Sequence, residues 1–215
     1  MLNDYFFDFS SSDFLFFTPL KEDSSFLPIT VIFAIGLFFL KEVFEFVKKH
    51  KANNRKIFAM KRLFSRECEK NLWTVKILRR VLSEINEEYE NGKEVKLKFS
   101  EHEQGYVYIY KDDGSMSGLS ITKTRRELMD KNLMEAAVSS EALFKKLEGA
   151  CDALAELEHI RDSFLNIENS SKEFGNPLLA GFLGYALEEI LTIQQSLNDL
   201  YKYCTGNELE NARLR

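Results

Sequence analysis

The sequence predicts a mainly α-helical protein with one N-terminal transmembrane helix and a helical domain that carries a small antiparallel β-meander. Three observations predict this fold class: a long apolar run, several stretches with helical periodicity, and one stretch with the period of two that strands have. At 215 residues, the chain is long enough for one folded domain and a membrane anchor.

The apolar run covers residues 26–47. Its first fifteen residues, FLPITVIFAIGLFFL, carry no charge, and apolar side chains recur as far as Val47. Twenty-two helical residues measure about 33 Å, which is enough to cross the ~30 Å hydrocarbon core of a bilayer. We therefore predict a single transmembrane helix over 26–47. The alternative is a buried core helix, because fifteen apolar residues also suit that role.

The order of charges along the chain sets the expected orientation. Residues 1–25 are aromatic and acidic with one base, whereas residues 48–66 contain eight bases and no acid. These bases are Lys48, Lys49, Lys51, Arg55, Lys56, Lys61, Arg62 and Arg66. Positive residues mark the cytoplasmic flank of a span, so we expect a plasma or inner membrane protein with its N-terminus outside and its C-terminus in the cytoplasm. The same basic juxtamembrane segment is predicted to contact anionic lipid headgroups.

Lys41 and Glu45 stand one helical turn apart inside the predicted span. They form either an interfacial helix end, from which Lys41 reaches the headgroups, or an intramembrane pair that marks an ion path or a subunit contact.

Residues 67–215 are predicted to form a cytoplasmic helical domain. After a polar break at 52–54, a helix is expected from 55 to 91, with an apolar residue every third or fourth position and Asn91-Gly92 as its stop. Two further periodic stretches flank a loop at 169–177 and predict an antiparallel helical hairpin. The domain is thus a bundle of about three helices, or half of a larger coiled-coil assembly completed by a second copy.

A period of two replaces the helical period between residues 94 and 122. Strands are expected at 95–99, 106–110 and 119–122, with a turn at Asp113-Gly114. Tyr106, Tyr108 and Tyr110 fall on one face of the middle strand. This face is either a partner-binding surface or the side that packs on a helix.

No motif for catalysis, nucleotide binding or metal binding occurs in the chain, so we expect neither an enzyme nor a cofactor. The three cysteines are scattered, which predicts buried thiols in a reducing compartment. Nucleic acid is not expected as a partner, because the chain beyond the basic segment is acidic.

The leading functional hypothesis is a membrane-anchored, non-enzymatic interaction protein that assembles with lipids and with a protein partner or itself. One alternative is a toxin or defence effector that permeabilises the bilayer on oligomerisation, with residues 177–187 as a segment that inserts after a trigger. A second alternative is an enzyme whose site has no recognised motif.

Overall fold

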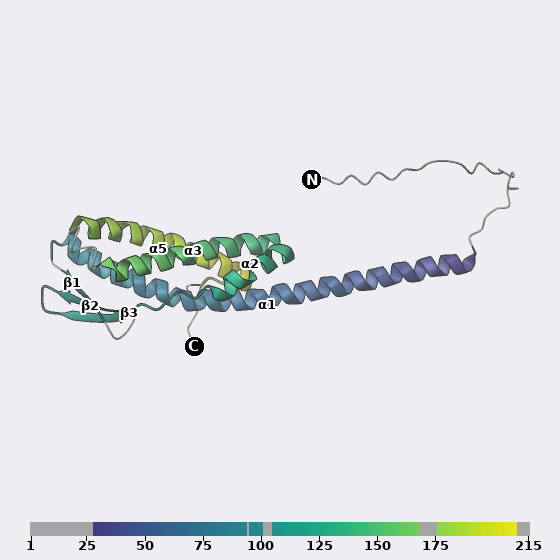
Figure 1. The fold of residues 1–215 in the computed structure, drawn as a ribbon, viewed down its shortest axis with the longest axis horizontal. Coiled ribbons are helices and arrows are strands. Elements are labelled where there is room, and N and C mark those ends of the chain that lie inside the picture. The colour runs from purple at the N-terminus through teal and green to yellow at the C-terminus, as the bar shows by residue number, and fades with distance from the viewer. Residues whose placement is uncertain (1–27, 94, 101–104, 168–175, 210–215) are drawn as a thin grey trace, which may run out of the picture. The chain divides into compact units, whose positions relative to one another are not determined.

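The computed structural model describes residues 28–93, 95–100, 105–167 and 176–209. The described chain is mainly helical with a small three-stranded antiparallel sheet, as predicted (Figure 1). Its elements are α1 (Ile29–Glu90), β1 (Val95–Phe99), β2 (Tyr106–Lys111), β3 (Met116–Ser120), α2 (Glu127–Ser139), α3 (Glu141–Leu165) and α5 (Asn176–Thr205).

Helix α1 begins directly after Pro28, whose carbonyl accepts the N–H of Val31 at 2.8 Å. It runs without interruption through residues 52–54, where the sequence predicted a break. The single alanine there is the best helix former, and each asparagine costs only about 0.7 kcal/mol or less. The helix ends as predicted, because Gly92 adopts a φ of 71° and the N–H of Lys93 donates to the carbonyl of Glu88 at 3.0 Å.

The chain divides into two compact units, residues 1–48 and residues 49–215. Within the described residues, no helix combines the length and the apolar character that crossing a membrane requires. The uncharged stretch Ile29–Leu40 measures only about 18 Å, and three charged residues follow it before Val47. This finding corrects the predicted transmembrane helix over 26–47. Residues 26 and 27, like the predicted outer segment 1–25, lie outside the described chain.

In the second unit, α3 and α5 form the expected antiparallel hairpin and lie side by side (Figure 1). Lys146 near the start of α3 pairs with Asp199 near the end of α5 at 2.7 Å. The predicted apolar stripe of α1 faces the same core: Leu72, Val75, Leu78, Leu82 and Ile85 are buried. Loop 169–177 falls mostly outside the described residues, but α5 begins at Asn176, so that Pro177 occupies its first turn as predicted.

Helix α2 is an element that the sequence did not separate from α3. The two helices meet at Ser140, whose extended backbone interrupts the helix and whose hydroxyl accepts the N–H of Leu143 at 3.3 Å. The described residues therefore contain four helices rather than about three.

The sheet has the order β1-β2-β3 and packs against the C-terminal part of α1 and the end of α3. Val107 and Ile109 point into the core, and the ring of Phe99 lies 5.7 Å from that of Phe164. Strand β3 occupies 116–120 instead of the predicted 119–122, because the turn at Gly114 is tight and Tyr110 pairs directly with Met116.

Candidate functional site

The first candidate surface is the apolar beginning of α1 in the first unit. Ile29 is 70% exposed and Phe33 is 69% exposed, although both are large and apolar. The exposed apolar side chains of this stretch are Ile29, Val31, Ile32, Phe33, Ile35, Leu37, Phe38, Phe39 and Leu40. Successive residues are about 100° apart around a helix, so these side chains cover every side of it. A helix that is apolar all round is stable only in apolar surroundings.

The predicted pair Lys41 and Glu45 follows this stretch. The Lys41 Nζ and a Glu45 carboxylate oxygen are 4.0 Å apart, with side chains 70% and 45% exposed. This is the geometry of a weak surface pair.

The second candidate surface is the basic segment 48–66. Two of its eight bases contact the bundle. Lys56 forms a salt bridge with Glu135 of α2. The ammonium of Lys61 donates to the Tyr203 carbonyl at 3.3 Å and lies 4.0 Å from the centroid of the Tyr203 ring. The other six bases are exposed and form no salt bridge with a described residue: Lys48, Lys49, Lys51, Arg55, Arg62 and Arg66.

The third candidate surface is the outer face of the sheet. Tyr106, Tyr108 and Tyr110 alternate with the buried residues of β2, so they point away from the core. The rings of Tyr106 and Tyr108 are 4.9 Å apart, and Tyr106 lies over Gly118, where an added Cβ would come within 2.7 Å of the tyrosine hydroxyl oxygen. Tyr110 is the most exposed of the three. Within the described residues, the tyrosines therefore lie on the face of β2 opposite the one that packs on α1, and the ladder stays a candidate partner surface.

A row of buried polar side chains on α1 is a feature that sequence reasoning missed. The carboxylate of Glu67, only 5% exposed, accepts the N–H of Met129 at 3.2 Å and so caps the start of α2 from another helix. One helical turn later, the side-chain amide of Asn71 donates to the backbone carbonyl of Arg125 at 2.7 Å and accepts the backbone N–H of Arg125 at 2.8 Å. Thr74 shares a 2.6 Å hydrogen bond with Thr122. Burial raises the pKa of Glu67, with the capped N–H groups opposing the shift.

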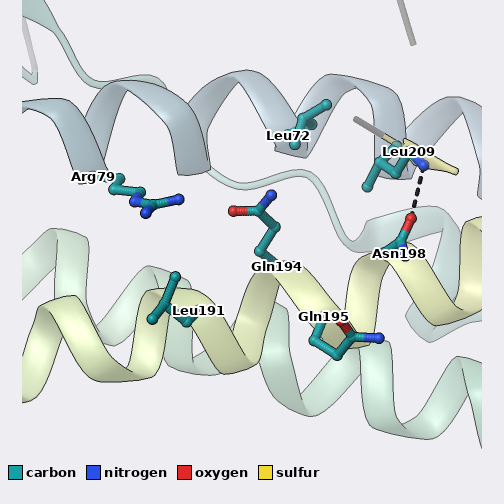
Figure 2. A pocket seen from close by; sticks show the side chains of 7 residues that line it. All are labelled: Leu72, Arg79, Leu191, Gln194, Gln195, Asn198 and Leu209. Carbon is teal, nitrogen blue, oxygen red and sulfur yellow. Dashed lines mark hydrogen bonds between the residues drawn. The ribbon is translucent and has the colours of Figure 1, made fainter. Parts of the chain in front are cut away.

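Glu67 also lines a hollow of about 330 Å³ with Lys70, Thr124, Arg125, Glu127 and Leu128. Its carboxylate is already bound to backbone N–H groups, so its chemistry in this structure is that of a helix cap. A second hollow of about 280 Å³ lies between α1 and α5 (Figure 2). Arg79 points across it toward Gln194, and Asn198 accepts the N–H of Leu209 at 2.7 Å. The described residues that line this second hollow include no carboxylate, imidazole or thiol, so they offer no general acid or base.

The cysteines are free thiols, and Cys68 and Cys151 are buried as predicted, with Cys204 half-buried. Burial raises the pKa of Cys151 to about 12, which keeps the thiol protonated and unreactive. No cluster of three potential metal ligands occurs among the described residues.

The segment 177–187, predicted either to pack closely or to insert after a trigger, forms the first turns of α5. Leu183 and Ala186 are buried in the core. A Cβ placed on Gly181 or Gly184 would meet nothing within 4 Å, so neither glycine serves a close helix contact.

Comparisons with protein-family models, with curated proteins and with solved structures found no match to this chain.

Proposed function

We propose that the chain is a membrane-bound, non-enzymatic assembly protein that holds a helical domain at an anionic, cytoplasmic membrane surface. The observation that carries this proposal is the exposed apolar stretch Ile29–Leu40, which is followed, after residues 41–47, by the basic segment 48–66. The proposal needs the apolar stretch to enter the lipid, not to cross it.

Two free-energy terms support binding. Nine exposed Leu, Ile, Val and Phe side chains each favour the bilayer interior by about 0.3–0.6 kcal/mol, or roughly 3–5 kcal/mol together. Lys48, Lys49 and Lys51 are exposed about two to three helical turns after the stretch, and each base near an anionic leaflet adds about 1 kcal/mol. Lys41 then belongs to the headgroup layer, where its ammonium remains hydrated.

The assembly part of the proposal rests on the second unit. Its tyrosine ladder exposes amphipathic rings of the type enriched in protein interfaces. Lys98 pairs with Tyr108 and Lys96 with Tyr110 in the sheet register, so two exposed bases border the rings.

Co-sedimentation of the full chain with lipid vesicles tests the membrane part. We expect binding to vesicles that contain phosphatidylserine, and binding weakened about tenfold or more by Phe33→Asp with Phe38→Asp. The matched control is Met134→Asp with Val138→Asp, two apolar residues of α2 that are 77% and 86% exposed. The control should bind like the wild type. Equal binding by all three proteins, or none by the wild type, would refute the proposal.

A further inference from the structure

The exposed side of α1 in the second unit carries a one-sided positive charge. From Lys48 to Arg80 the chain has twelve Lys and Arg residues against two acids. Of these acids, Glu67 is buried as a helix cap and Glu69 accepts the hydroxyl of Tyr201 at 3.1 Å. Four exposed bases on one line of the helix, which we name the α1 basic stripe, are Arg55, Arg62, Arg66 and Lys70.

The opposite charge lies along α3. Six acids and three bases occur in this helix, and one of the bases, Arg161, is buried. Its outer line of acids, which we name the α3 acidic stripe, is Glu141, Glu148, Asp152 and Glu156, and one exposed base, Lys145, lies on the same line. Glu148 and Asp152 are exposed and form no salt bridge with a described residue; Glu141 pairs with Lys145, and Glu156 accepts the hydroxyl of Tyr185.

The two stripes have the same spacing. Residues 55, 62, 66 and 70 are separated by seven, four and four positions, and so are residues 141, 148, 152 and 156. At 1.5 Å per residue the charges of both stripes fall at about 0, 10, 16 and 22 Å along their helices. A basic and an acidic stripe with equal spacing match when two helices lie parallel.

We propose that the α1 basic stripe of one copy binds the α3 acidic stripe of a second copy. This inference rests on the assembly part of the proposed function and is independent of membrane binding. The charges that face each other are Arg62 with Glu148 and Arg66 with Asp152, with Arg55 and Lys70 at the ends. When the two stripes of a copy bind different neighbours, the contact is heterologous, and a dimer keeps one stripe of each sign free for further growth. Arg55, Arg62 and Arg66 then serve assembly, and lipid contact is left to the lysines that precede them.

Charge reversal in the full chain, kept in neutral detergent, tests this contact. One variant combines Arg62→Glu with Arg66→Glu, and the other combines Glu148→Lys with Asp152→Lys. Each should raise the dissociation constant for self-association, measured by sedimentation, by about tenfold or more. Self-association of the wild type should also weaken at about 1 M salt, where charges are screened beyond ~3 Å. The control, Lys123→Glu with Lys131→Glu, changes net charge as much at exposed sites off the stripe and should leave association unchanged.

Mixing the two stripe variants gives the decisive result. In each variant alone, positions 62 and 66 face positions 148 and 152 with charges of like sign. In an equimolar mixture, the altered α1 stripe of one variant and the altered α3 stripe of the other again carry opposite charges at these positions, so the mixture should assemble. Failure of the mixture to assemble, or a monomeric wild type at low salt, would overturn the inference. Loss of phosphatidylserine binding in Arg62→Glu with Arg66→Glu, from a wild type that does not self-associate, would assign the stripe to lipid instead. If the full chain binds vesicles but the mixed variants do not assemble, the membrane proposal is supported and the stripe contact is refuted.

Discussion

Glu67 stabilises the fold although an ionised carboxylate is more stable in water than in the protein interior. A carboxylate that is 5% exposed loses most of its hydration, and burial accordingly raises its pKa. The side chain stays in place because α2 begins beside it and presents N–H groups that lack partners within their own helix. Glu67 thus joins two helices through a contact between residues that are 62 positions apart in the chain.

Replacement of Glu67 should separate its charge from its hydrogen bond. Glu67→Gln keeps an acceptor for the Met129 N–H and removes the buried charge, so stability at pH 7 should stay within about 1 kcal/mol of the wild type. Glu67→Ala removes the cap and should lower the free energy of unfolding by about 1–2 kcal/mol. Chemical denaturation followed by circular dichroism measures both.

The pH dependence supplies the control for this residue. Because the folded-state pKa of Glu67 is raised, the folded protein binds its proton more tightly than the unfolded chain does. The wild type therefore loses stability from this group as pH rises through its unfolded pKa, about 4.3, toward the folded value. Relative to Glu67→Gln, the wild type should gain stability as pH falls below neutrality. A difference that does not change with pH would contradict the assigned cause.

At the scale of the element, the apolar stripe of α1 determines how this helix joins the bundle. Leu78 is fully buried, whereas Leu63, about four helical turns earlier and on another face, is 40% exposed. We expect Leu78→Ala to lower the free energy of unfolding by about 2–5 kcal/mol, since it removes buried methyl groups and leaves a cavity. Leu63→Ala is the matched control and should change stability by less than half as much. Thermal melting of both variants, followed by circular dichroism, checks the register; equal losses would show that the assigned faces are wrong.

The periodicity of apolar residues predicted the buried faces of helices and strands better than it predicted where these elements begin and end. Local rules that the structure obeys account for the stripe of α1 through Leu72 and Ile85, the strands at 95–99 and 106–110, and the stop at Gly92. The separation of α2 from α3 depended on one serine whose side chain caps a helix, a role that serine shares with many loop positions.

The polar contacts of α1 could not be predicted from the sequence, because they depend on tertiary structure. Glu67, Asn71 and Thr74 look like ordinary solvated residues until the segment that precedes α2 covers them. The sequence likewise predicted the basic segment, but it did not predict that Lys56 and Lys61 contact residues of the bundle. The predicted span was wrong because charged residues were counted within it, and α1 offers too short an uncharged stretch among the described residues.

At the scale of the whole chain, an apolar helical stretch precedes a bundle whose helices differ in charge. The central proposal is that Ile29–Leu40 enters lipid. The single tryptophan, Trp73, is half exposed and belongs to the second unit, so it can be moved to test this claim. The most direct measurement is the fluorescence of a Phe38→Trp, Trp73→Phe variant with vesicles of phosphatidylserine and phosphatidylcholine whose acyl chains are brominated. We predict a shift to shorter wavelength and strong quenching for this variant, because position 38 lies among the acyl chains, and little quenching of Trp73 in the native chain. Emission from position 38 that neither shifts nor is quenched would contradict the claim.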